Sequence, residues 1–122
     1  MLEALNEYYL FNLAGGRKKV NVLLSDILAI TSLKEGHQDK IMYLKNNANH
    51  KIRGYTLQYL IKITGFLQRV NKRDLVAPYA VKFIDEEMIE LTFCEEKDKP
   101  KWIVLSGKYR NAFLKTLHYY KK

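Results

Sequence analysis

The sequence has little cysteine, no long apolar run and, over two long stretches, no acidic residue. Cys94 is the one cysteine, so no internal disulfide can form, and a cytoplasmic location is expected. No apolar run reaches the length needed to cross a bilayer, which argues against a transmembrane helix. The opening residues 1–7 also lack the basic and apolar regions of a signal peptide.

The overall amino-acid composition is that of a folded domain. Hydrophobic residues make up 48% of the chain and charged residues 28%, which is ordinary for a globular protein and argues against disorder. A chain of 122 residues is long enough to bury a core but too short for two domains. We therefore expect residues 1–122 to form a single domain.

The net charge of +8 is unevenly distributed along the chain. Residues 40–73 carry eight basic side chains and no acid, and residues 99–122 carry seven and no acid. Residues 74–98, between them, carry eight acids against two bases. This pattern predicts a molecule with a positive face and a negative face. Nucleic acid is the commonest polyanion that would explain the positive face, and charge that serves only solubility is the alternative.

The sequence offers little that could perform catalysis. Its three histidines have no metal-ligand partners at useful spacing, and a lone cysteine in a strand is usually packed rather than nucleophilic. The acidic clusters 85–87 and 95–96 fall in predicted turns, where solvated charge is the ordinary interpretation. Gly15 and Gly16 lack the ending and the following helix of a phosphate loop. We therefore expect neither an enzyme nor a bound cofactor or metal.

Apolar and polar residues alternate along most of the chain, which predicts antiparallel strands. Segment 27–33 is predicted to be a buried strand, and segment 95–100 a charged loop. The predicted strands are 8–13, 19–24, 27–33, 40–45, 50–53, 81–84, 88–93 and 101–105. The predicted fold class is mainly β, with small antiparallel sheets and two short helices.

The two helices are expected near Thr56–Thr64 and Ser106–Tyr119. Thr56 is a good N-cap for the first helix, and Gly65 is a C-terminal stop. The first turn of the second helix carries two bases against the helix dipole, and a phosphate bound at that end would offset their cost. The apolar stripe of this second helix is predicted to comprise Tyr109, Ala112, Phe113 and Leu117.

The stretch 66–76 has two apolar ends and a polar centre, which predicts a strand, a loop and a returning strand. The loop contains Arg69, Asn71, Lys72 and Arg73. Side chains of these types are well suited to pair with purine edges and phosphates. A solvated turn with incidental charge is the alternative interpretation of this loop.

These segments resemble the LytTR family of bacterial DNA-binding domains. The family's central motif runs roughly Phe-x-Arg-φ-His-Arg-Ser-φ-φ-Val-Asn, where φ is apolar, and residues 67–77 offer Leu-Gln-Arg-Val-Asn-Lys-Arg-Asp-Leu-Val-Ala. Its last motif, a strand ending in Ser-Arg-x-Tyr before a helix, corresponds to residues 104–109. The opening hairpin, residues 25–27 and the first helix also match in order, so the resemblance covers about residues 8–117.

The resemblance implies an elongated fold that contacts double-stranded DNA through loops rather than through a recognition helix. Carried over by position, the implied base contacts are His37, Asn71, Lys72 and Lys108. The implied phosphate contacts are Arg69, Arg73, Ser106 and Arg110. The sequence departs from the family pattern at Asn71, Arg73, Ala77 and Gly107, where histidine, serine, asparagine and arginine are common.

A cytoplasmic bacterial transcriptional regulator that binds specific duplex DNA is thus the expected function. Two copies of such a domain could also pair on tandem DNA sites. Two alternatives stay open: a basic module that binds protein or RNA, and a LytTR-like regulator that titrates a partner without reading DNA. An exposed cluster of aromatic side chains on the basic face would favour RNA, because single-stranded bases stack on such rings. Most aromatic residues here lie at strand positions that we expect to be buried.

Overall fold

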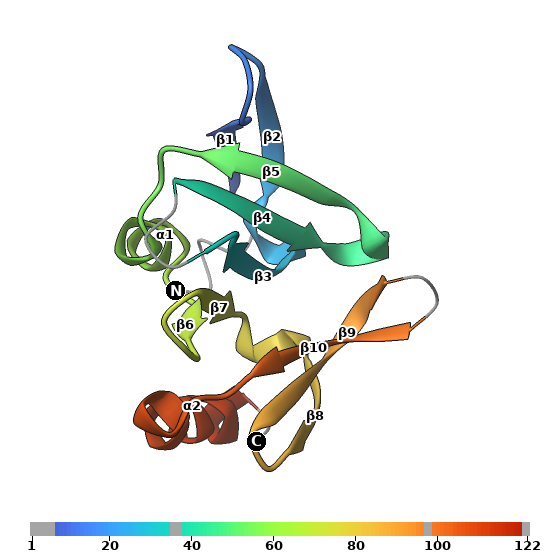
Figure 1. Ribbon diagram of the computed structural model, residues 1–122, viewed down its shortest axis with the longest axis vertical. Helices are drawn as coiled ribbons and strands as arrows, with labels where there is room; N and C mark the ends of the chain where they lie inside the picture. The colour runs from blue at the N-terminus through green and yellow to red at the C-terminus, as the bar shows by residue number, and fades with distance from the viewer. Residues whose placement is uncertain (1–6, 35–37, 97–98, 121–122) are drawn as a thin grey trace.

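Strands dominate the computed structural model of the protein, which describes residues 7–34, 38–96 and 99–120 (Figure 1). The strands are β1 (Tyr8–Asn12), β2 (Lys19–Leu23), β3 (Ile27–Ser32), β4 (Asp39–Leu44), β5 (Asn49–Arg53), β6 (Gln68–Arg69), β7 (Asp74–Val76), β8 (Val81–Asp85), β9 (Met88–Glu96) and β10 (Lys99–Val104). The helices are α1 (Leu57–Thr64) and α2 (Gly107–Tyr120), with short 3-10 turns η2 (Leu24–Asp26), η3 (Lys45–Asn47) and η4 (Pro78–Ala80).

The central sheet has five strands in the order β5-β4-β3-β7-β6, paired antiparallel throughout. Strand β3 lies in its middle, and Ile27, Leu28, Ala29 and Ile30 are fully buried. A strand that is covered on both faces needs apolar residues at consecutive positions rather than at alternate ones. The prediction of a buried strand in this segment is therefore confirmed.

Two smaller antiparallel sheets lie at opposite ends of the long axis, which makes the molecule elongated (Figure 1). One is the β1–β2 hairpin, whose turn places Gly15 at a φ of 84°, a conformation that glycine adopts without steric cost. The other has the order β10-β9-β8. Together with the central sheet, they confirm a mainly β fold built from small antiparallel sheets with two helices.

Helix α1 begins and ends at the predicted capping residues. The Oγ1 atom of Thr56 accepts a hydrogen bond from the backbone N–H of Tyr59 at 3.0 Å. At the other end, Gly65 adopts the left-handed conformation and donates its N–H to the carbonyl of Ile61 at 2.9 Å. Both caps satisfy backbone groups that the helix itself leaves unpaired.

The predicted charged loop at 95–100 is wrong, because strands β9 and β10 continue into it. Glu95 pairs with Pro100 and Glu96 with Lys99 in the antiparallel ladder. A hairpin ladder is held by backbone hydrogen bonds, which extend past the point where side-chain alternation stops. Pro100 is compatible with this strand because β10 lies at the edge of its sheet.

Helix α2 packs through a narrower stripe than the sequence predicts. Phe113 is 1% exposed, whereas Tyr109 and Leu117 are half-buried. Ala112, predicted to face the core, is exposed instead. The helix lies mainly against η4 and β6, and among its described residues Phe113 is the one that is fully buried, whereas the neighbouring Ala112 is left outside the contact.

An aromatic cluster joins β1 to α1. The rings of Phe11 and Tyr55 lie 5.5 Å apart, and those of Tyr55 and Tyr59 lie 6.2 Å apart and stacked. The hydroxyl groups of Tyr9 and Tyr59 are hydrogen-bonded at 3.0 Å. This hydrogen bond, with a smaller effect of burial, raises the pKa of Tyr9 from 10.0 to about 12.

We therefore expect one tyrosine to ionise late in an alkaline titration followed by phenolate absorbance. Because the folded-state pKa is the higher one, the stabilisation is complete below pH 10.0 and is lost as the pH rises to about 12. Tyr59→Phe should return the late transition towards pH 10.0. If all tyrosines of the folded protein ionise together, the hydrogen bond does not hold the Tyr9 proton.

Candidate nucleic-acid interface

The turn between β6 and β7 is held by the side chain of Asn71. Its Oδ1 atom accepts hydrogen bonds from the N–H groups of Arg73 (2.7 Å) and Asp74 (3.0 Å). Its Nδ2 group donates to the Asp74 carboxylate (2.7 Å) and to the carbonyl of Val104 on β10 (2.8 Å). These four bonds use the full hydrogen-bonding capacity of an amide. In this conformation Asn71 therefore positions the turn and has no group left for a base edge.

Arg69 ties the same turn to the start of α2. Its Nε and Nη2 groups donate to the carbonyls of Asn71 (3.2 Å) and Lys72 (3.0 Å). Its guanidinium also lies 5.7 Å from the ring centre of Tyr109, and the Lys108 Nζ atom lies 5.5 Å from the same ring. Cations are attracted to the electron-rich face of an aromatic ring. The ring of Tyr109 thus contacts one basic side chain from β6 and one from α2.

The backbone reinforces this junction. Ser106, which immediately precedes α2, donates its N–H to the carbonyl of Val70 at 2.8 Å, and its own carbonyl accepts from the N–H of Tyr109 at 3.0 Å. The segments that hold Lys72 and Lys108 are therefore brought together, although they are far apart in the chain.

Arg73 braces the end of β3. Its guanidinium donates to the carbonyl of Ser32 through Nε (3.2 Å) and Nη2 (2.9 Å), and to that of Leu33 through Nη2 (2.7 Å). It therefore fixes the chain where it leaves β3. His37 itself lies outside the described residues, so its predicted role stays a prediction.

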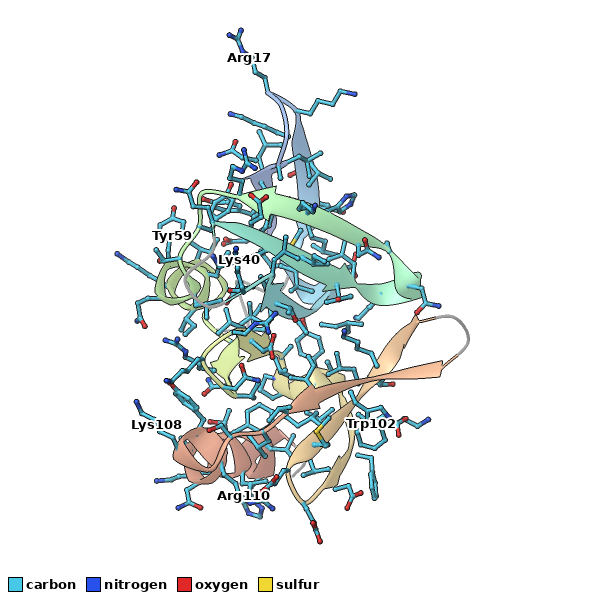
Figure 2. All side chains as sticks on the ribbon, in the orientation of Figure 1. Arg17, Lys40, Tyr59, Trp102, Lys108 and Arg110 are labelled. Atoms are coloured by element: carbon cyan, nitrogen blue, oxygen red, sulfur yellow. The ribbon has the colours of Figure 1, made fainter. Side chains whose placement is uncertain are left out.

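Arg110 lies apart from the other predicted contacts. Its Nη1 group donates to the carbonyl of Glu86 in the β8–β9 turn, where Glu86 adopts a φ of 45°. Figure 2 shows Arg110 below α2, on the side away from Lys108. Its position favours a structural role at the hairpin rather than a share in the basic cluster.

A groove of about 640 Å³ adjoins the cluster. Its walls include three basic residues, Lys40, Arg69 and Lys72, and no acidic one among the residues that the structure describes. Lys40 is only 5% exposed, and this burial lowers the pKa of its ammonium, an effect that the Asp39 carboxylate opposes. We call this the basic groove.

Sequence reasoning missed Lys40 and Tyr109 as parts of this face. The signal for Lys40 was present, because it shares its strand face with Met42 and Leu44, which are buried. Tyr109 was assigned to the core stripe, and its half-buried ring does contact the fold, but it also carries two cations.

The expectation that most aromatic residues lie at buried strand positions is wrong for several of them. On strands, Tyr8 is 63% exposed, Phe83 55% and Trp102 37%, and on helix α1 Tyr59 is 43% exposed. Alternation places a residue on one face of a strand, but it does not say whether another layer covers that face.

In the described part of the chain, no helix is long and apolar enough to cross a membrane. The same residues contain no cluster of three or more His, Cys, Asp or Glu side chains placed to hold a metal ion.

The protein is an elongated β domain. Its basic cluster is formed by the β6–β7 turn and the start of α2. A scan against models of protein families finds no match, and a search of curated proteins finds no similar sequence. A search of solved structures does find a match, the LytTr DNA-binding domain of a Bacillus cereus protein described as a methyl-accepting/DNA response regulator. The two share 15% sequence identity and align with a TM-score of 0.64 over 90% of this chain and 95% of that one. The chain therefore has the fold of a LytTr DNA-binding domain, as the sequence resemblance implied.

Proposed function

We propose that this protein is a cytoplasmic bacterial transcriptional regulator that binds specific duplex DNA with the face around the β6–β7 turn and the start of α2. The observation that carries the proposal is the convergence of Arg69 and Lys108 on the ring of Tyr109, in a fold shared with a LytTr DNA-binding domain. Basic side chains gathered on one face of the protein supply the electrostatic part of DNA binding.

The proposal divides the predicted contacts by side-chain type and exposure, and by the positioning bonds of Asn71 and Arg110. Lys72 and Lys108 are exposed and suited to donate to guanine edges, and His37 keeps the base-contacting role that the resemblance implies. Arg69, Arg73 and Ser106 are assigned to phosphates, with the two arginines also bracing the loops. Asn71 and Arg110 are assigned to positioning, because backbone and side-chain partners within the domain already engage them.

Selection from random duplexes, followed by competition with variants, tests this division. Lys72→Ala and Lys108→Ala should each relax preference at one or two base pairs, by roughly 1–3 kcal/mol of discrimination. Arg73→Ala should weaken binding to all sequences and reduce the salt slope by about one contact, or about 0.9 in log K against log salt. The exposed Lys115, farther along α2, is the matched control and should change little.

Two outcomes would contradict the proposal. If no duplex is selected, or if binding is independent of salt, the protein does not bind DNA in this way. If Lys72→Ala and Lys108→Ala weaken binding without altering sequence preference, the basic side chains attract DNA only through their general positive charge. They do not then contact specific base pairs.

A second candidate is single-stranded RNA, which the exposed rings favour. Tyr59 and Tyr9 line a second hollow that shares Gly54, Tyr55 and Thr56 with the basic groove. Bases could stack on exposed rings beside a basic surface. Affinity for single-stranded RNA above that for the selected duplex, and its loss in Tyr59→Leu, would support this candidate. The reverse order of affinities would support DNA.

A further inference from the structure

The β1–β2 hairpin carries three consecutive basic residues at and just after its turn. Arg17, Lys18 and Lys19 are all exposed, and residues 8–25, which include both strands and the turn, contain no Asp or Glu. Figure 2 shows Arg17 at the tip of the hairpin, at one end of the molecule, whereas Lys108 lies near the other end. The hairpin is thus a second basic element, separate from the basic cluster of the β6–β7 turn and the start of α2.

The hairpin is fastened to the rest of the fold at its base. The side chain of Phe11 on β1 is fully buried. The N–H of Asn12 donates a hydrogen bond to the Tyr55 hydroxyl at 2.7 Å. Just beyond, the N–H of Ala14 donates to the carbonyl of Lys51 on β5 at 2.9 Å. The turn therefore has a fixed place relative to the basic cluster, as contact with the regularly spaced phosphates of a duplex requires.

Two adjoining hollows connect the hairpin to the basic cluster. The basic groove has Arg69 and Lys72 of the cluster in its wall, and the second hollow has Lys19 of the hairpin in its wall. Both hollows include residues 54–56, the link from β5 into α1. The hairpin and the basic cluster therefore border one continuous hollowed surface, along which a single extended polyanion can lie.

We infer that the β1–β2 hairpin is a second phosphate-backbone contact, which binds the same duplex as the basic cluster but beyond the base pairs that the cluster reads. The inference rests on the proposed function and deepens it. Arg17 is suited to hold a phosphate through two parallel hydrogen bonds, and Lys18 and Lys19 are suited to contact neighbouring phosphates as point charges. Contacts of this kind raise affinity and fix orientation without selecting a sequence.

Because the hairpin lies at one end of the elongated molecule, its contact with the DNA should be one-sided. Three duplexes test this: the selected site trimmed to the base pairs that show a preference, and the same site extended at either end by about one helical turn, roughly 10 base pairs. Extension on the hairpin side should raise the affinity of the wild type, and extension on the other side should not. The affinity for each duplex is measured at several salt concentrations.

The hairpin variant combines Arg17→Gln with Lys18→Gln and leaves the glycines of the turn in place. On the duplex extended at the hairpin side it should bind roughly ten- to a hundredfold more weakly than the wild type at low salt. Its salt slope should be shallower by about 1.8, or about 0.9 for each of two lost phosphate contacts. On the trimmed site, the hairpin variant and the wild type should bind alike, with the same sequence preference.

The matched control combines Lys82→Gln with Lys115→Gln, which removes the same charge from exposed positions on β8 and α2. It should gain affinity on extension as the wild type does. All four substituted side chains are exposed, so both variants should keep the wild-type melting temperature, which shows that each is folded. An equal loss in the control would mean that total charge, rather than the hairpin, sets the affinity, and would overturn the inference.

The remaining outcomes separate this inference from the proposed function. If the wild type and the hairpin variant respond alike to both extensions, the hairpin does not reach the flanking backbone, and DNA binding by the basic cluster stands. If the hairpin variant loses affinity for single-stranded RNA while its duplex binding is unchanged, the hairpin serves RNA and the inference is wrong. If the wild type selects no duplex at all, the proposed function and this inference fail together.

Discussion

Replacing Phe113 with alanine is expected to lower the free energy of unfolding by about 3–5 kcal/mol, the usual cost of truncating a buried aromatic side chain. Phe113 is 1% exposed and is the one fully buried side chain among the described residues of α2. The helix lies against η4 and β6. Without Phe113, the helix loses the side chain that it buries most deeply in the core.

The same substitution should also weaken nucleic-acid binding, because α2 carries Lys108 and Tyr109. Denaturant unfolding measures the first effect as a shift of the midpoint at an unchanged slope. Asn111→Ala, an exposed position on the same helix, is the control and should change the stability by less than about 0.5 kcal/mol. A Phe113→Ala protein of wild-type stability would mean that other contacts hold α2 in place.

Asn71→Ala is expected to lower the free energy of unfolding by about 2–4 kcal/mol, because it removes four hydrogen bonds, two of them to the backbone N–H groups of the turn. One of the lost bonds links the turn to the carbonyl of Val104, just before α2. Both halves of the proposed interface should therefore loosen together. Thermal or denaturant unfolding and duplex affinity provide the two measurements.

Asn71→Asp sharpens this test. The carboxylate keeps the two acceptor bonds but cannot donate to Val104, and it would lie close to the Asp74 carboxylate, to which the amide now donates at 2.7 Å. We expect a loss of stability near that of the alanine variant, smaller at acidic pH, where one carboxyl of such a pair takes up a proton. A positioning role predicts weaker binding to all sequences in both variants. A change of preference at one base pair, with stability intact, would instead restore Asn71 as a base contact.

Several features of the candidate site could be predicted because they depend on neighbouring residues. The turn between β6 and β7 follows from two apolar pieces around a polar centre, and α2 begins at the position that Ser106 suggested. The two acid-free blocks also predicted a basic face, and Arg69, Lys72 and Lys108 do lie in or beside one cluster. The presence of the interface was thus more predictable than the role of each side chain in it.

Those roles depend on partners far away in the chain. Asn71 binds a carbonyl 33 residues later, and Arg73 binds carbonyls 41 and 40 residues earlier. Arg110 is held by a hairpin turn 24 residues before it. A loop sequence rich in Asn and Arg looks the same whether these side chains point towards a ligand or fasten the loop itself.

The sequence alone determined the elements that local physics controls. Alternation placed the strands, consecutive apolar residues marked the buried β3, and Thr56 and Gly65 bounded α1, because each depends on backbone conformation and on groups a few residues away. Tertiary structure alone decided that Lys40 borders a groove, that Tyr109 carries two cations and that Ala112 and several aromatic rings are exposed. These outcomes depend on which distant segments pack together and on which faces are left uncovered, and no periodicity within a single segment contains that information.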